Sequence, residues 1–205
     1  MVSLSIKRKL HMNDAQYDAQ LNINTEIYYE SYSRSNIHRY EPTYYRHLEQ
    51  LFQAIAHKIQ TDDVLIDIGS GMHRVPIYAA DYFGIKTKGV EINKQLYMSA
   101  LKNIKQYNTI KQCQIEAYNC DILKYNIKQE DTIFFFFNPF SINVFRTFIN
   151  MLLKKNKKRC IIILYYPDDA FISYLRDLNV FQCTMVIELE HYYKDEREQI
   201  LIFEI

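Results

Sequence analysis

From residue 44 onward, the chain alternates short apolar stretches with stretches of helical periodicity, and this alternation restricts the fold more than any other feature. The apolar stretches are short and rich in Val, Ile and Phe, so each one predicts a strand. They are VLIDI (64–68), TKGVEI (87–92), QIEAYN (114–119), TIFFFFN (132–138) and CIIILYY (160–166). Helices are expected over 44–59, 73–83, 93–107, 142–154 and 169–178. Apolar strands that alternate with helices predict a parallel sheet covered on both faces.

The last two apolar stretches are separated only by a charged turn. TMVIELE (184–190) and QILIFEI (199–205) flank HYYKDERE (191–198), which leaves no room for a crossover helix. These two strands must therefore pair antiparallel. The expected fold is a three-layer αβα, Rossmann-like sheet with five parallel strands and a C-terminal antiparallel hairpin.

The first 39 residues differ in composition from the rest of the chain. They are polar, with many Asn, Tyr and Ser, and their periodicity is weak. We expect residues 1–39 to form an N-terminal lead-in that is helical or flexible. Residues 40–205 contain no repeat and no Pro/Gly linker, so they are expected to form a single domain.

Composition and charge restrict the partners and the location. The 25 Lys and Arg residues nearly cancel the 24 Asp and Glu residues, so no overall positive field favours nucleic acid or an anionic membrane. No apolar run approaches the roughly 18 residues of a membrane span, and the first residues do not resemble a signal peptide. We expect a cytoplasmic protein without a membrane partner. Its abundant Tyr, Ile, Asn and Lys indicate an AT-rich, bacterial genome. The cysteines (Cys113, Cys120, Cys160, Cys183) form no CxxC pair, so no metal is expected. The oligomeric state stays open.

Two of the four glycines lie one residue apart in IDIGSGMHR (66–74), directly after the first strand. Gly69 and Gly71 permit positive φ and lack a Cβ, so a ligand can lie against bare peptide N–H groups at the start of the next helix. In an open parallel sheet this turn lies at the carboxyl edge, where ligands bind. The alternative is a purely structural role, because strand-to-helix turns use glycine in any case.

Three acids follow the same logic, since each lies near the end of a successive strand. Asp67 precedes the glycines, Glu91 can accept the two hydroxyls of a ribose, and Asp121 can accept from an exocyclic amino group. Together they predict an adenosine-bearing ligand. A dinucleotide site requires GxGxxG, but here the sixth position is Arg74. A cofactor with a positively charged amino-acid end suits Asp67 better.

The motifs DIGSG, GVEIN, NCD and FFFFNPFS, in this order, resemble those of the class I S-adenosylmethionine-dependent methyltransferases. The resemblance covers about residues 40–205 and implies a catalytic domain that uses S-adenosylmethionine. It implies that Asp67, Gly69, Ser70 and Gly71 hold the methionine part, Glu91 the ribose, and Cys120 and Asp121 the adenine. Many members carry a third glycine where this chain has His73. That histidine is expected either at the surface of the helix N-terminus or as a functional base.

The stretch HRYEPTYY (38–45) resembles the lead-in that folds over the cofactor in some of these enzymes. Pro42 makes the segment rigid, so Tyr40 and Thr43 could contact the cofactor. The alternative is that Thr43 caps the following helix while the tyrosines pack outside the sheet.

Asn138, Pro139 and Phe140 follow the fourth strand, where the reactive methyl group is expected. They resemble a motif of the amino-methyltransferases in which Asn or Asp is followed by Pro-Pro and an aromatic residue. In that motif the first side chain accepts hydrogen bonds from the target NH2. This chain has NPFS, with one proline and Phe in third place. DIGSG, GVEI and the fourth motif also resemble the non-SET histone lysine methyltransferases.

We therefore expect a methyltransferase with an unidentified acceptor, with the motif at residues 138–140 favouring a nitrogen atom. Small molecule, protein and nucleic acid remain open as acceptors. Asp168 is expected to cap the helix after the fifth strand or to pair with a basic group of the acceptor. The alternative functions are a non-catalytic S-adenosylmethionine-binding protein, such as a sensor or partner subunit, and a nucleotide-dependent oxidoreductase.

Overall fold

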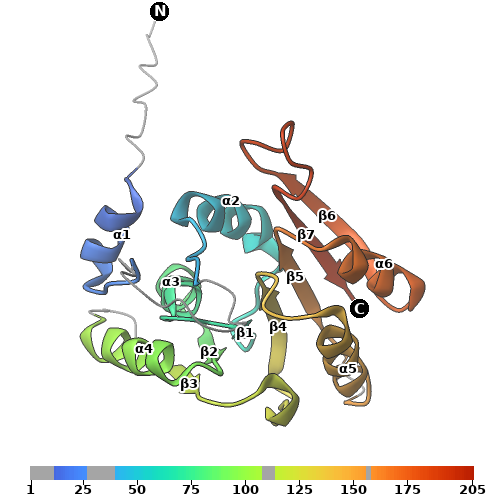
Figure 1. Cartoon of the computed structure of the whole chain (residues 1–205), viewed down its shortest axis with the longest axis horizontal. Coiled ribbons are helices and arrows are strands. Elements are labelled where there is room, and N and C mark those ends of the chain that lie inside the picture. Colours follow the sequence, from blue (N-terminus) through green and yellow to red (C-terminus); the bar gives the residue numbers. More distant parts are fainter. Residues whose placement is uncertain (1–11, 27–39, 108–113, 156–157) are drawn as a thin grey trace, which may run out of the picture.

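A computed structural model of the chain describes residues 12–26, 40–107, 114–155 and 158–205, and a seven-stranded sheet forms its centre (Figure 1). The strand order is β3-β2-β1-β4-β5-β7-β6. The strands are β1 (Val64–Ile68), β2 (Lys86–Val90), β3 (Ile115–Tyr118), β4 (Asp131–Phe136), β5 (Ile161–Tyr165), β6 (Gln182–Glu188) and β7 (Gln199–Glu204). The first five are parallel, while β7 pairs antiparallel with both β5 and β6. The expected sheet with its C-terminal hairpin is therefore confirmed.

Helices cover both faces of the sheet and complete the three layers. One face packs against α2 (Tyr45–Ile55) and α3 (Arg74–Phe83), and α4 (Lys94–Gln106) lies beside β3. The other face packs against α5 (Ile142–Leu153) and α6 (Asp169–Asp177). Short 3-10 helices, η1 (Ala56–Lys58) and η2 (Ile122–Lys124), follow α2 and β3.

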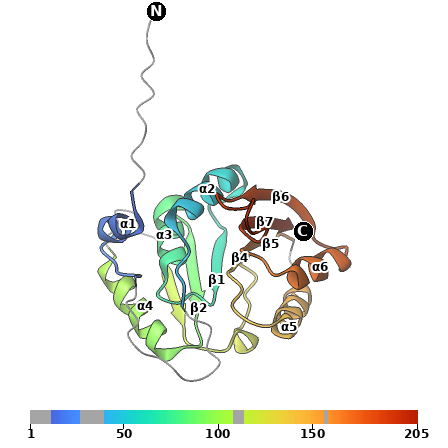
Figure 2. The same ribbon diagram turned by 45° about the horizontal axis from the view of Figure 1, so that its top comes forward.

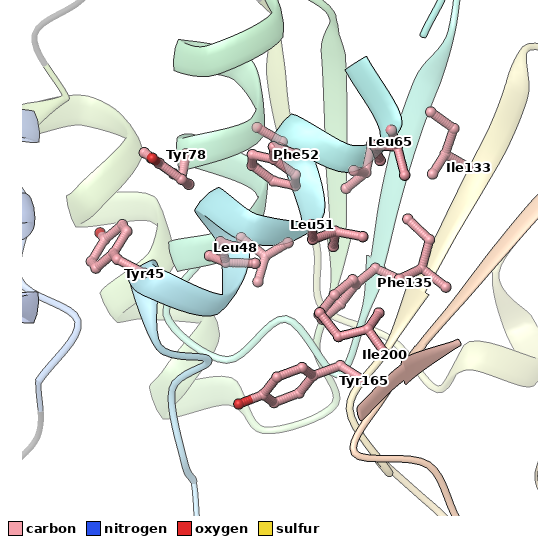
Figure 3. Packing of buried hydrophobic residues seen from close by; sticks show 14 of the residues in the cluster. Tyr45, Leu48, Leu51, Phe52, Leu65, Tyr78, Ile133, Phe135, Tyr165 and Ile200 are labelled. Carbon is pink, nitrogen blue, oxygen red and sulfur yellow. The ribbon is translucent and has the colours of Figure 1, made fainter. Parts of the chain in front are cut away.

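The alternation of side chains along β4 explains why its phenylalanine run is buried on both faces. Phe135 points into the cluster under α2 and α3, whereas Phe134 and Phe136 point into the cluster under α5 and α6. Figure 3 shows the first of these interfaces, where the apolar stripe of α2 lies over β1 and β4. Leu48, Leu51 and Phe52 from this stripe are fully buried. The core therefore fixes the orientation of α2 and of the lead-in before it.

The described part of the lead-in contains one helix, α1 (Asp14–Leu21), capped at its start by Asn13. It lies beside α3 and α4 (Figure 2). Tyr17, Leu21 and Ile23 are buried in the same cluster as α2. Residues 1–11 and 27–39 of the predicted lead-in lie outside the described residues. The division of the chain at residue 40 stays a prediction.

Candidate active site

The polar residues identified in the sequence lie around the point where the strand order reverses. β1 lies between β2 and β4, so the loops that follow these three strands meet at the carboxyl edge of the sheet. These loops carry Gly69, Glu91 and Asn138. Residues that are far apart in the sequence are thus brought to one edge.

The glycine loop after β1 adopts the expected left-handed backbone. Gly69 has φ +81° and Gly71 has φ +52°, a region that costs a residue with a Cβ about 1–2 kcal/mol. A Cβ on Gly69 would lie 2.7 Å from Pro139, and one on Gly71 would lie 2.1 Å from the Tyr40 ring. The space beside these glycines is therefore taken by side chains of the protein itself.

The N–H groups of this loop also have partners within the protein. Gly69 and Ser70 donate to the Val90 carbonyl at 2.9 and 3.1 Å, and Gly71 donates to Glu91 Oε2 at 2.9 Å. The expectation that these groups are bare is wrong, because the carbonyl and carboxylate at the end of the neighbouring strand accept from them. A cofactor contact by Gly69, Ser70 and Gly71 stays a prediction.

Two buried acids lie next to this loop. Asp67 is 4% exposed and Glu91 is 6% exposed. Burial raises the pKa of Asp67 well above its ordinary value, and the nearby Glu91 carboxylate raises it further. Burial also raises the pKa of Glu91, against the opposing effect of the N–H groups of Asn93 and Gly71. Within the described ranges no group donates a hydrogen bond to the Asp67 carboxylate. A bound cation would therefore be stabilised here.

His73, at the position of the third glycine in related proteins, lies beneath the loop. It is fully buried, with Nδ1 3.1 Å from Ser70 Oγ and Nε2 3.3 Å from the Glu116 carbonyl oxygen. Burial lowers its pKa to about 4. A Cβ on Gly89 in β2 would lie 2.3 Å from the imidazole ring. The expected surface position is wrong, because the ring points into the sheet where Gly89 leaves room. A role as functional base stays a prediction.

The lead-in places Tyr40 on the glycine loop. Its hydroxyl donates to the Thr25 carbonyl at 3.2 Å, and its ring lies against Gly71. Thr43 is buried, and its carbonyl accepts from Arg74 Nη1 at 3.1 Å. The N-cap of α2 is Tyr44, without a side-chain bond, so the alternative capping role of Thr43 is wrong.

Sequence reasoning missed a buried polar cluster that attaches α1 to the glycine loop. Arg74 is 2% exposed, forms an ion pair with Asp14, and donates through Nε to Thr25 Oγ1 at 2.6 Å. Asp18 accepts from the Tyr45 hydroxyl at 2.6 Å and from the Thr25 N–H at 2.5 Å. The signal available in the sequence was the spacing of Asp14 and Asp18, which lie on one face of a helix.

The predicted adenine side lies after β3. Asp121 caps η2 by accepting from the Leu123 N–H at 2.9 Å, and Cys120 is half-buried. Asn119, which the sequence did not single out, donates to the Glu91 carbonyl at 2.8 Å and so ties this loop to the loop after β2. Ile92, also missed, is 71% exposed beside Glu91. An apolar surface therefore lies next to the acids.

The predicted acceptor side separates into two parts. Asn138 and Pro139 lie at the glycine loop, where Pro139 contacts Gly69. Phe140 instead packs toward α6, with its ring centroid 6.2 Å from that of Phe136 and 6.4 Å from that of Phe171. A role for Asn138, Pro139 and Phe140 in catalysis stays a prediction.

The Asn138 amide joins the loops after β4 and β5. Its Nδ2 donates to the Tyr166 carbonyl, and its Oδ1 accepts from the Asp168 N–H at 3.1 Å. The Asp168 side chain caps α6, as expected, by accepting from the Ala170 N–H at 2.7 Å. The neighbouring Tyr165 hydroxyl lies 2.9 Å from Nδ1 of the buried His47.

A groove of about 1170 Å³ lies between α1, α2 and the end of β6. It reaches the lead-in at Pro42, two residues after Tyr40. Its charged lining is mostly acidic, with five carboxylates and two arginines, and Arg46 and Arg74 pair with only two of the carboxylates, Glu190 and Asp14. The acidic residues are Asp14, Glu26, Glu49, Glu188 and Glu190.

Neither a metal site nor a membrane span is found in the part of the chain that the structure describes. It contains no cluster of three or more His, Cys, Asp or Glu side chains able to hold a metal ion. None of its helices has the length and apolar character needed to cross a membrane.

The fold is similar to that of solved methyltransferases. The human methyltransferase 10 domain containing protein has a TM-score of 0.64 at 15% identity, over 93% of this chain and 92% of that one. An RNA methyltransferase from Salinibacter ruber, in complex with S-adenosyl-L-homocysteine, has a TM-score of 0.57 at 19% identity, over 80% of this chain and 92% of that one. The N-terminal domain of human METTL16 in complex with SAH has a TM-score of 0.57 at 15% identity, over 91% and 76%. At such low identities these similarities show the class I methyltransferase fold.

A comparison with curated protein sequences gave no match. A family model described as "Histone methylation protein DOT1" matches residues 17–165, which is most of the chain and includes the loops after β1, β2, β3 and β4. The chain therefore belongs to the DOT1 family of class I methyltransferases, and S-adenosylmethionine is its cofactor.

Proposed function

We propose that this chain transfers a methyl group from S-adenosylmethionine to a nitrogen atom of its acceptor. The observation that carries the proposal is the buried pair of Asp67 and Glu91, which lies next to the loop of Asn138. No cationic side chain of the described residues pairs with either acid. When bound, the cofactor supplies an electrophilic methyl group on a positively charged sulfur. The two acids favour a positively charged ligand in this desolvated place.

The carboxylates at the strand ends would fit the cofactor, while Tyr40 and Pro139 fill the space directly beside Gly71 and Gly69. Each Glu91 oxygen accepts one backbone N–H, from Gly71 or Asn93, and keeps a lone pair for a ribose hydroxyl. Asp67, which lacks a donor among the described residues, would accept from the ammonium group. Tyr40 and Thr43 in the lead-in and Gly69, Ser70 and Gly71 in the loop would border the methionine part.

The adenine would lie over the loops that Asn119 joins. Asp121 caps η2 through Oδ1, which leaves Oδ2 to accept from the adenine amino group. Cys120 precedes it, and the exposed side chain of Ile92 offers an apolar surface to the base. These contacts would place the reactive end of the cofactor toward β4.

Asn138 would orient the nitrogen acceptor. Its Oδ1 accepts one backbone N–H and keeps a second lone pair for a hydrogen of the target amine. A fixed amide would point the nitrogen lone pair at the methyl group, and such alignment can supply most of the rate. Pro139 would keep the Asn138 loop against Gly69.

The groove beside the lead-in favours a basic polypeptide as the acceptor. Its exposed charges are mainly carboxylates, which attract lysine and arginine side chains and repel the phosphates of RNA. The family description concerns histone methylation, which agrees with a basic protein. The RNA methyltransferases of similar fold share less than 20% identity, so they do not bear on this chain's acceptor.

The cofactor part of the proposal is tested by calorimetry with S-adenosylhomocysteine. We expect micromolar binding by the wild-type chain, strongly weakened binding by Asp67→Asn, and wild-type binding by Asp62→Asn, because Asp62 is exposed at the opposite edge of the sheet. Absence of heat and of a thermal shift at millimolar ligand would contradict it, and protection by NAD instead would favour an oxidoreductase.

The acceptor part is tested by tritium transfer from labelled S-adenosylmethionine into a fractionated cell extract. We expect label that is sensitive to protease and resistant to nuclease, and a large loss with Asn138→Ala but not with Asn143→Ala, which changes an exposed residue of α5. Nuclease-sensitive label would contradict the basic protein acceptor. Binding without any transfer would favour a sensor or partner subunit.

A further inference from the structure

Two residues at the acceptor side adopt a backbone conformation that residues with a Cβ avoid. Asn138 has φ +37° and Tyr166 has φ +52°. Tyr166 also precedes Pro167, and a residue before proline favours extended backbone. Such a conformation persists only where the surroundings enforce it.

The two residues constrain each other through the Asn138 amide. The amide donates to the Tyr166 carbonyl and accepts from the Asp168 N–H, so both of its ends are fixed. The Tyr166 carbonyl points at the amide because its backbone is left-handed. One lone pair of Oδ1 and one N–H of the amide remain for a ligand.

Tyr166 is in turn fixed by the hairpin. Its N–H donates to the Gln199 carbonyl at 3.0 Å, and its hydroxyl donates to Asp195. Arg197 pairs with Asp195, with Nη2 2.9 Å from Oδ2, and its guanidinium lies 5.1 Å from the centre of the Tyr166 ring. The turn between β6 and β7 therefore fixes Tyr166 through its side chain as well as its backbone.

We propose that Tyr166 is a positioning residue for the methyl acceptor: it holds the Asn138 amide in its reactive orientation, and Asp195 and Arg197 of the β6–β7 turn hold Tyr166. This inference rests on the proposed function, because it assigns a role to Asn138. It extends the site to a hairpin that lies outside the residues matched by the family model. Tyr166 acts through Asn138 rather than on the reacting atoms.

A double-mutant cycle tests the inference. Tyr166→Phe removes the bond to Asp195 and keeps the ring, so we expect kcat for methyl transfer to fall about threefold to tenfold, as for the loss of one hydrogen bond. The affinity for S-adenosylhomocysteine should not change. In the Asn138→Ala background, Tyr166→Phe should have less than about a twofold further effect, because the residue it positions is gone. Tyr193→Phe, at an exposed tyrosine of the same turn, is the control.

A second readout needs no acceptor. The side-chain amide resonances of Asn138, assigned by their loss in Asn138→Ala, should shift or broaden in Tyr166→Phe, while those of Asn119 should not. Equal losses of kcat in both backgrounds, or unchanged Asn138 resonances with wild-type kinetics, would overturn the inference. A wild-type chain that binds no cofactor would count against the proposed function instead.

Discussion

Replacing Gly89 by alanine should destabilise the fold, because this glycine makes room for His73. A Cβ at residue 89 would lie 2.3 Å from His73 Cε1, 2.5 Å from its Nε2 and 2.6 Å from Ser70 Oγ. The ring is buried and both of its nitrogens have partners, so it has no alternative position nearby. Gly89 lies within β2, and no left-handed backbone contributes to the cost.

The expected loss follows from two opposing effects. Forcing one extra methyl group into a packed core costs about 1–3 kcal/mol. Alanine in a strand interior recovers about 0.5–1 kcal/mol of the entropic cost of glycine. The free energy of unfolding should therefore fall by up to about 2.5 kcal/mol, and for a chain of this size each kcal/mol lowers Tm by about 2–4 °C.

Urea denaturation of a double-mutant cycle with His73→Ala measures this effect. The alanine keeps the left-handed backbone cost at residue 73 and removes the ring, so Gly89→Ala should cost at least about 1 kcal/mol less in that background. Gly84→Ala, at the left-handed C-cap of α3, is the control and should cost the same in both backgrounds. Equal costs of Gly89→Ala in the two backgrounds would refute the explanation that His73 occupies the space of a missing Cβ.

Three other predictions concern charge. Arg74→Met should destabilise the chain by about 3 kcal/mol, which is near the lower end for a broken buried ion pair because Asp14 is 21% exposed. It should also speed hydrogen exchange in α1, and unchanged exchange there would contradict the prediction. The control Arg46→Met, at an exposed residue, should change stability by less than about 0.5 kcal/mol. Because burial lowers the pKa of His73 to about 4, the folded state binds fewer protons than the unfolded state between there and the ordinary value of about 6.5, so up to about 3 kcal/mol of stability should be lost as the pH falls through this window. Burial also lowers the pKa of His47 to about 4, so in urea titrations His73→Ala should reduce the pH dependence by about half, whereas His57→Ala should leave it unchanged. Since the pKa of Asp67 is raised in the free chain, cofactor binding should release protons, and the calorimetric enthalpy should depend on the buffer in the wild-type chain but not in Asp67→Asn.

The sequence predicted the fold well because the parallel strands are continuous buried runs. The strand expected over 64–68 is the observed β1 (Val64–Ile68), and the other boundaries moved by a few residues at most. β6 (Gln182–Glu188) begins two residues before the expected start. This start was missed because the first residues of the strand are exposed and show no apolar run in the sequence. The antiparallel pairing of the last two strands followed from the short charged turn between them.

The candidate site was predicted less completely, because much of it depends on contacts between distant residues. The acids at the strand ends could be identified from their spacing. Three contacts could not be identified in this way, because the partners come from different elements and no spacing in the sequence indicates which residues meet. They are the fit of His73 to Gly89, the ion pair of Arg74 with Asp14, and the hydrogen bond from Asn138 to the Tyr166 carbonyl. The left-handed backbone of the glycine loop was predicted, but the reason given for it was a ligand beside the glycines. In the structure, the side chains of Tyr40 and Pro139 occupy that space.

The cofactor side and the acceptor side of this site depend on different parts of the chain. The acids and the glycine loop belong to β1 and β2, within the residues that define the family, whereas Tyr166, Glu190 and Asp195 lie beyond residue 165. Family membership should therefore fix the cofactor more strictly than the acceptor. If residues 191–197 were replaced by a Gly/Ser turn, binding of S-adenosylhomocysteine should persist while methylation of the acceptor falls together with the order of the Asn138 amide. Loss of cofactor binding in this variant would show that the hairpin supports the whole edge of the sheet, and the division between the two sides would then be wrong.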